Sequence, residues 1–305
     1  MKRAVSISIG SKKRDKVVEV EILGQHVSLE RIGTDGDMEA AARLYGELDG
    51  KVDAFGVGGA LLGFMIDTQW YSLHSIKPLT RFVKHTPVVD GTGLKMTLER
   101  KAASVIADSG MINPKPKRAL LISAVDRYGL SRSFMDAGYE YVIGDLMFSL
   151  GITIPIKSDA GLKNVARLLI PTAGRLPFAW LYPTGESQNK RTPKFTKYFH
   201  WADVIAGDCH FITKYMPDDM ENKIIVTNTT TEEDRSLFKN AGVKYLVTTT
   251  PMYEGRSFGT NVLEAGIVSA LGIKQPINYA APGDYFEKMN DALEQLNIKP
   301  NLMEL

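Results

Sequence analysis

The stretch Leu121–Asp145, "LISAVDRYGLSRSFMDAGYEYVIGD", decides the fold of this chain. An apolar strand is followed by a short loop, then by an amphipathic helix, and then by a second strand that ends on an acid. This order predicts a β-α-β unit of the kind that opens a dinucleotide-binding domain. The loop "SAVDRYG" (123–129), however, holds a single glycine where the dinucleotide fingerprint carries three.

The alternation of strands and helices continues on both sides of this unit. Apolar strands are expected at 202–207, 223–228 and 243–249, and a hairpin is expected over 17–33. We therefore predict an α/β protein of two domains. An N-terminal α/β domain over 1–112 is the expected substrate domain. A Rossmann-like domain over 113–305 has a mainly parallel sheet covered by helices on both faces. The proline-rich segment 111–118 is the linker, and an irregular insertion is expected at about 151–200.

Composition narrows the function classes. The 305 residues carry a net charge of +2 and are 44% hydrophobic and 24% charged, a balance that argues against nucleic acid and membrane surfaces as partners. The single cysteine, Cys209, excludes a disulfide framework. No segment has the length of a signal peptide core or a membrane span, so a cytoplasmic location is expected. The expected partner is a small-molecule substrate, and the oligomeric state, a homo-oligomer included, is left open.

Polar residues follow the strands that are expected to form the second sheet. Ligands of open parallel sheets bind at the carboxyl ends of the strands, so these residues are candidates for a cofactor site. Asp145 follows Ser123 by 22 residues, close to the spacing of a ribose-binding acid, and an acid there favours NAD over NADP. The alternative is an ordinary strand–helix turn without a phosphate. The predicted cofactor-binding residues are Ser123, Asp126, Arg127, Gly129, Asp145 and Asp208.

Two further segments contain residue types that are typical of a catalytic or substrate-binding site. Asp90, between Gly91 and the end of a strand, could orient or deprotonate a substrate hydroxyl, with Lys77 or Lys95 as a partner charge. The segment "TTTPMYEGRSFGTN" (248–261) is rich in hydroxyls and leads into a helix N-terminus, where anions are favoured. The alternatives are a helix-entry turn and a capped helix. The predicted substrate-binding residues of this segment are Thr249, Thr250, Arg256, Ser257 and Asn261. The histidines lack metal-ligand spacing, so no metal is expected.

The order of these parts resembles the shikimate/quinate 5-dehydrogenase family, and the whole chain is similar to bacterial proteins labelled quinate 5-dehydrogenase-like. The turn "VVDGTG" (88–93) aligns Asp90 with the catalytic-site aspartate that the family carries in an N-T-D-G turn. The family's catalytic lysine motif, N-V-T-x-P-x-K, is absent, and Lys77 in "HSIKPL" is its nearest positional counterpart. The family's glycine-rich loop is replaced by "SAVDRYG".

The favoured function is an NAD- or NADP-dependent dehydrogenase acting on a hydroxylated carboxylic acid of quinate/shikimate type, with its site in the interdomain cleft. Asp90, with Lys77 or Lys95, would handle the hydroxyl proton, and Arg256 would hold the substrate carboxylate. Two alternatives keep the fold. One is a non-redox binding or regulatory protein for a nucleotide or metabolite. The other is a lyase or transferase that uses the polar loops at the strand ends.

Overall fold

The computed structural model describes the chain apart from residues 111–114, 176–190, 254–255 and 258, and describes only the backbone of 252–253 and 256–257. The chain forms two compact units, each built from separate segments. Unit 1 contains Met1–Leu94, Ile170–Thr184 and Gly259–Asn297. Unit 2 contains Lys95–Leu169, Gly185–Phe258 and Ile298–Leu305.

These units differ from the two expected domains, because each expected domain is one continuous stretch of the chain and each unit is built from separate segments. The expected boundary at 112/113 lies within 111–114, outside the described residues. The segment Gly259–Asn297 belongs to unit 1 although it follows most of unit 2 in the chain. Its first helix, α11 (Thr260–Ala270), is apolar and almost wholly buried. Such a helix must pack on a sheet, but its sequence does not say on which one.

The sheet of unit 1 has the order β2 (Lys16–Ile22), β3 (Gln25–Gly33), β1 (Lys2–Ser8), β4 (Ala54–Gly58) and β7 (Val88–Val89). Strands β2 and β3 are antiparallel, which confirms the expected hairpin, and the other neighbours pair in parallel. A separate hairpin is formed by β5 (Gly63–Ile66) and β6 (Gln69–Ser72).

Helices cover both faces of this sheet. Successive side chains of β1 point to opposite faces, so β1 contacts helices on both. Val5 and Ile7 of β1 join one apolar core with α1 (Met38–Leu48) and the 3-10 helix η2 (His74–Thr80). Ser6, on the opposite face, accepts a hydrogen bond from the side chain of Asn261 on α11. Helix α12 (Tyr285–Gln295) completes unit 1.

The sheet of unit 2 has six strands. Their order is β15 (Asn301–Glu304), β12 (Tyr245–Thr248), β11 (Ile224–Thr227), β10 (Val204–Ala206), β8 (Arg118–Leu121) and β9 (Glu140–Ile143). All neighbours are parallel except β15, which runs antiparallel to β12. The predicted Rossmann-like sheet is therefore confirmed, and the β-α-β unit of the opening stretch lies at β8 and β9.

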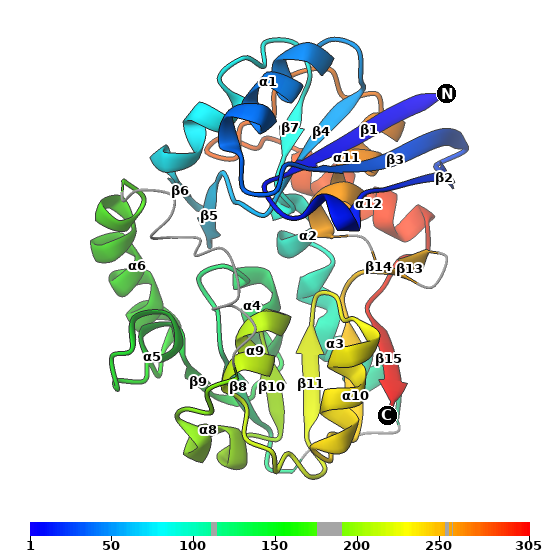
Figure 1. Cartoon of the computed structure of the whole chain (residues 1–305). Coiled ribbons are helices and arrows are strands. Elements are labelled where there is room, and N and C mark those ends of the chain that lie inside the picture. The colour runs from blue at the N-terminus through cyan, green and yellow to red at the C-terminus, as the bar shows by residue number, and fades with distance from the viewer. Residues whose placement is uncertain (111–114, 176–190, 254–255, 258) are drawn as a thin grey trace. The chain divides into compact units, whose positions relative to one another are not determined.

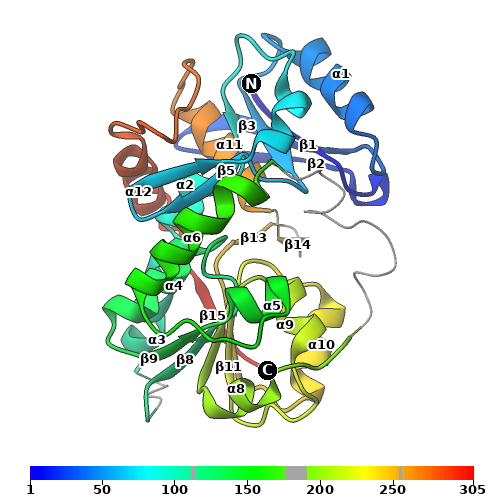
Figure 2. The ribbon, with the colours of Figure 1, turned by 90° about the vertical axis from the view of Figure 1, so that its left-hand side faces the viewer.

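Helices also cover both faces of the second sheet (Figure 2). The core on one face joins alternate residues of five strands to α5 (Asp145–Leu150), α8 (Thr196–Trp201), α9 (Cys209–Tyr215) and α10 (Glu232–Asn240). The other face carries α3 (Ala102–Asp108) and α4 (Tyr128–Asp136). The segment that leads from β7 to residue 108 is divided into α2 (Thr92–Met96), the 3-10 helix η3 (Glu99–Lys101) and α3.

The expected insertion at about 151–200 contains regular structure in its described part. Ile156 forms an antiparallel bridge with Ile143 of β9, and α6 (Asp159–Ala173) and α8 follow. Residues 176–190 lie outside the described residues. In the parts of the chain that the structure describes, no helix is long and apolar enough to cross a membrane.

The strand order places a topological switch point in unit 2. Strand β8 is the first of the unit; β9 adds on one side of it, and β10, β11 and β12 add on the other. Crossovers leave β8 and β10 in opposite directions, which opens a crevice at their carboxyl ends, the usual ligand position in such sheets. The residues after these two strands include Ser123, Arg127 and Asp208.

Gly129 determines how closely α4 approaches the start of unit 2. A Cβ atom at this position would overlap the carbonyl oxygen of Lys95. We expect Gly129→Ala to lower the free energy of unfolding by roughly 1–3 kcal/mol or more, because backbone cannot yield as a flexible side chain would. Gly138→Ala is the control, since Gly138 has a positive φ of 75° but open space around it. It should cost only about 1–2 kcal/mol. Denaturant titration of both variants measures the difference, and an equal or smaller loss for Gly129→Ala would contradict the steric account.

Candidate functional site

The switch point of unit 2 is occupied by a buried arginine and its acidic partners. Arg127, the residue before α4, is 3% exposed. Its guanidinium donates to Glu99 Oε1, and its Nη2 donates to Asp208 Oδ2 over 2.9 Å. Glu99 lies on η3 and is fully buried, whereas Asp208 caps the N-terminus of α9. One arginine therefore ties the loop after β8 to the loop after β10 and to η3.

A second ion pair extends this cluster towards solvent. Lys95 Nζ donates to Asp126 Oδ1 over 2.5 Å, and Asp126 Oδ2 lies 3.7 Å from Arg127 Nε. The side chain of Asp126 is 26% exposed and that of Asp208 is 20% exposed. Thr249 also faces the cluster, with its hydroxyl 3.5 Å from Glu99 Oε1. The solvent-facing groups of the switch point are thus carboxylates, behind which the guanidinium is buried.

Burial and ion pairing shift the pKa values of this cluster in opposite directions. Burial acts to raise the pKa of Asp208, but the charges of Arg127 and His210 and the hydrogen bonds from both residues together outweigh it, and the net shift is downward. The pKa of Glu99 is raised, because complete burial outweighs the opposing effect of Arg127 and Lys95. Burial acts to lower the pKa of Arg127, yet Glu99, Asp208 and Asp126 together raise it. Arg127 therefore stays charged, and the cluster depends on its charge.

The carboxylate of Asp145 accepts hydrogen bonds from the loop after β8. Its Oδ2 accepts a hydrogen bond from the N–H of Ala124 over 2.9 Å, and its Oδ1 accepts one from the N–H of Val125 over 2.8 Å. Burial raises the pKa of Asp145 to about 7, against the lowering effect of these two donors. The side chain is 8% exposed and both its oxygens are engaged. Asp145 is therefore a structural acceptor for the loop.

This arrangement does not fit a dinucleotide held in the usual way. A pyrophosphate needs free N–H groups in the loop after the first strand and an acid at the end of the second strand for the ribose. Here the N–H groups of Ala124 and Val125 donate to that very acid. The terminal nitrogens of Arg127 are committed to Glu99 and Asp208. Of the predicted cofactor residues, Arg127 pairs with Asp208 and Asp126, and the Ser123 hydroxyl accepts from the N–H of Asp208. Asp145 is bonded to backbone N–H groups instead, and Gly129 lies against the carbonyl of Lys95.

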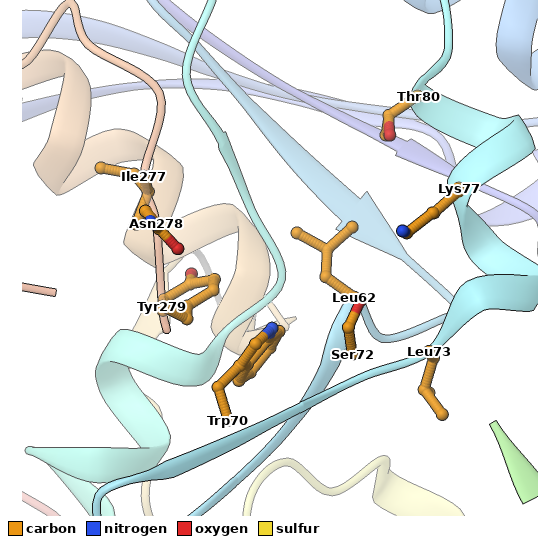
Figure 3. Close-up of a pocket in the computed structure, with 9 residues that line it drawn as sticks. All are labelled: Leu62, Trp70, Ser72, Leu73, Lys77, Thr80, Ile277, Asn278 and Tyr279. Atoms are coloured by element: carbon orange, nitrogen blue, oxygen red, sulfur yellow. The ribbon is translucent and has the colours of Figure 1, made fainter. Parts of the chain in front are cut away.

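Unit 1 contains a pocket of its own (Figure 3). Its volume is about 160 Å³. Lys77 and Thr80 of η2 line one side, and Trp70 and Ser72 of β6 line another. The remaining walls come from Leu62, Leu73 and the segment Ile277–Tyr279. In Figure 3 the amino group of Lys77 points towards the middle of the pocket, and Asn278 and Tyr279 lie on the opposite side.

Asp90, the predicted catalytic aspartate, has a structural environment. It is 3% exposed and does not line this pocket. Its Oδ1 accepts from the N–H of Thr92 over 3.0 Å, and its Oδ2 accepts from the N–H of Leu62 over 2.7 Å. Asp90 therefore joins the turn after β7 to the residue that leads into β5. Lys77 belongs to the same unit, whereas Lys95 belongs to unit 2.

The predicted substrate-binding residues are divided between the units. Thr249 and Thr250 follow β12 in unit 2 and are buried, and the Thr250 hydroxyl donates to the carbonyl of Asn228. Asn261 lies on α11 in unit 1, where its side chain is used in the contact with Ser6. Arg256 and Ser257 form β14 (Arg256–Ser257), paired with β13 (Met252–Tyr253), and their side chains lie outside the described part of the chain.

Family comparison covers almost the whole chain. Residues 93–305 match the family described as "Domain of unknown function (DUF8754)". The chain belongs to the DUF8754 family. Residues 3–90 match a second family, "Domain of unknown function (DUF8753)". The junction between the two matches, at 90–93, falls next to the division between the first segments of units 1 and 2 at Leu94 and Lys95. No curated protein matches this DUF8754 chain.

Several solved structures share a distant similarity with the DUF8754 chain. One is a putative malic enzyme (malate oxidoreductase), with 13% identity over 96% of this chain and 84% of that one and a TM-score of 0.39. Another is the NAD-dependent malic enzyme of Thermotoga maritima, with 12% identity over 96% and 84% and a TM-score of 0.38. A third is a carbohydrate transporter solute binding protein of Agrobacterium radiobacter in complex with D-arabinose, with 10% identity over 99% and 93% and a TM-score of 0.29. Similarities this distant assign no role to a residue.

Sequence reasoning missed two buried acids, one at the start of η3 and one on α11. Glu99 and Glu264 are completely buried acids, yet in the sequence each stands in a segment that has the pattern of an ordinary helix. The signal that could have found them is the acid itself, since each occurs at a core position of an otherwise apolar helix face. Among the described residues, no group of three or more His, Cys, Asp or Glu could hold a metal ion.

We expect the Glu99–Arg127 pair to behave as a buried ion pair in a double-mutant cycle. Arg127→Met leaves Glu99 without its charge partner, and Glu99→Gln removes the negative charge that the Arg127 guanidinium faces, so each should cost about 3–5 kcal/mol of unfolding free energy. The double variant should cost clearly less than the sum of the single variants. Denaturant titration measures all four proteins. Additive losses would show that the two side chains do not depend on each other.

Asp145 should make the stability of the fold depend on pH. Because its pKa is raised to about 7, its contribution is fully present below its unfolded pKa and is lost as the pH rises to about 7. Between pH 5 and pH 7 the unfolding free energy of the wild type should therefore fall relative to Asp145→Asn, by up to about 1.4 kcal/mol per pH unit. Above pH 7.5 the difference should stay constant. Denaturant titrations at several pH values test this, and parallel pH profiles would refute it.

Proposed function

We propose that the protein acts on, or binds, a small hydroxylated carboxylic acid, and that the pocket of unit 1 recognises it. The observation that carries this proposal is Lys77. Lys77 is exposed, its amino group faces the pocket, and no ion pair or hydrogen bond engages it in the described parts of the chain. A free ammonium group over a pocket favours a carboxylate, with which it forms a charge-assisted hydrogen bond.

The rest of the pocket suits a ring that carries hydroxyls. The rings of Trp70 and Tyr279 pack together with centroids 4.9 Å apart and form an aromatic wall. Ser72, Thr80 and Asn278 supply hydroxyl and amide groups that can both donate and accept hydrogen bonds. An apolar wall with a few polar groups around it is the usual composition of a small-molecule site.

The volume limits the size of the ligand. About 160 Å³ is close to the roughly 150 Å³ of an engineered protein cavity that binds benzene. Pockets for larger ligands occupy roughly 300–1,000 Å³. The pocket therefore suits a single six-membered ring or a short-chain acid, and it excludes a dinucleotide. A quinate- or shikimate-type acid has the required ring, hydroxyls and carboxylate.

An NAD- or NADP-dependent dehydrogenase is the second candidate, and one observation favours it. The sheet of unit 2 has parallel strands with a switch point at β8 and β10, where nucleotide cofactors bind in many proteins of this architecture. The loop N–H groups that would hold the pyrophosphate are engaged by Asp145, however, and we therefore place the non-redox function first. A binding protein, a lyase and a transferase all remain compatible with the pocket.

Calorimetric titration with shikimate and its methyl ester tests the role of Lys77. The wild type should bind shikimate, and Lys77→Met should weaken this binding roughly tenfold, because it removes the charge partner of the carboxylate. The uncharged methyl ester should bind both proteins equally. Lys51→Met, at an exposed lysine outside the pocket, is the matched control and should leave the affinity unchanged.

The outcomes of this titration separate the hypotheses. Equal affinity of the wild type and Lys77→Met for shikimate would remove Lys77 from the site. The absence of binding by shikimate, quinate and other small hydroxy acids at millimolar concentration would overturn the proposed function. A parallel thermal-shift series with NAD, NADP and their reduced forms tests the second candidate. A rise of the melting temperature with one of them would place the dehydrogenase first.

A further inference from the structure

Tyr279 belongs both to the pocket of unit 1 and to a buried network behind it. Its ring packs on Trp70 and lines the pocket, while its hydroxyl donates to Glu264 Oε1 over 2.9 Å. The same oxygen accepts from the Tyr285 hydroxyl over 2.5 Å and from the N–H of Gly93 over 2.9 Å. Three donors therefore converge on one oxygen of a single carboxyl group, and one of them is part of the wall of the pocket.

The other oxygen of Glu264 is in a different situation. The residue is fully buried on α11, and Oε2 has no hydrogen-bond partner among the described residues. An ionised carboxylate with an unsolvated, unpaired oxygen is costly, whereas Oε2 can carry a proton while Oε1 keeps its three donors. The network thus accepts a neutral Glu264 without rearrangement.

The ionisable groups that act on Glu264 come from three elements. Asp90, after β7, is an acid without a cationic partner in the described region of the chain. Tyr279 precedes α12, and Tyr285 lies on it. Burial and the charge of Asp90 raise the pKa of Glu264 to about 7, against the lowering effect of the two tyrosine hydroxyls and the Gly93 N–H. Glu264 therefore changes its charge near neutral pH.

We propose that Glu264 is a positioning residue of the pocket, and that its proton state, transmitted through Tyr279, sets the affinity of the pocket for a carboxylate ligand. The statement about the carboxylate rests on the proposed function, whereas the link from Glu264 to the aromatic wall does not. An anion in the pocket and an ionised Glu264 lie on opposite sides of the same tyrosine and repel each other. The ligand therefore binds best when Glu264 is neutral, and its binding is accompanied by proton uptake.

The first experiment uses no ligand and follows, against pH, the tryptophan fluorescence, to which Trp70 contributes as one of three tryptophans. In the wild type we expect an inflection near pH 7, because ionisation of Glu264 changes the hydrogen bond that holds the stacked Tyr279. Glu264→Gln and Trp70→Phe should both abolish the inflection. Glu287→Gln, at an exposed acid of α12, is the matched control and should keep it. Tyr279→Phe keeps the ring but removes the hydrogen bond to Glu264 through which the ionisation would reach Trp70, so this variant should also lose the inflection.

The second experiment measures the shikimate affinity of the folded wild type and Glu264→Gln between pH 6 and pH 8. The affinity of the wild type should fall roughly three- to tenfold over this range, as expected for two like charges a short distance apart. Calorimetry at pH 7 in two buffers of different ionisation enthalpy should show uptake of a fraction of one proton per ligand. Glu264→Gln should show neither effect.

The two experiments fail independently. A wild-type fluorescence profile without an inflection, or one that Glu264→Gln retains, would overturn the inference whatever the ligand is. An inflection in a protein that does not bind shikimate would leave the link from Glu264 to Trp70 in place and would contradict the proposed function. Binding of shikimate with an affinity independent of pH would support the proposed function and refute the coupling.

Discussion

The buried guanidinium of Arg127 is the interaction on which unit 2 depends. Three separate segments, η3, the loop after β8 and the loop after β10, supply its acidic neighbours. Each of these acids would be costly to bury alone, and the positive charge between them offsets that cost. The cluster occupies the switch point of a parallel sheet, where related architectures place a ligand. In this protein, side chains of the chain itself form an ion-pair cluster at the same position.

Asp145 illustrates how one position of a common architecture can change its role. An acid at the end of the second strand is the feature that suggests a ribose, but here the carboxylate binds the N–H groups of its own neighbouring loop. A carboxylate and a phosphate are both anions that use such N–H groups, so the N–H groups of Ala124 and Val125 cannot serve both.

Unit 1 combines a small polar pocket with a buried acid behind its wall. Lys77 and Trp70 face the pocket from η2 and β6, and Tyr279 connects it to Glu264 on α11. Burial places the pKa of Glu264 at about 7, so a modest change of its surroundings alters its charge. A pocket that carries both a lysine side chain and a nearby titrating acid can respond to the charge of its ligand. This property follows from burial, not from any exceptional residue type.

The sequence by itself determined the local structure. The hairpin over 17–33 and the β-α-β unit at 121–145 are both present, as the alternation of apolar residues predicts. Such local structure can be predicted because periodicity and turn chemistry act over a few residues. Tertiary structure alone decided where the segments go. Helix α11 joins the sheet formed by the first ninety residues, and Gly93 and Glu264, 171 positions apart, share a hydrogen bond. It also decided that Asp90 and Asp145 accept backbone N–H groups, whereas Lys77 faces a pocket. An Asp or Glu residue is written in the same way in the sequence whatever its environment. Only the groups packed around its carboxylate determine whether it accepts hydrogen bonds from a loop, changes its charge near neutral pH or contacts a ligand.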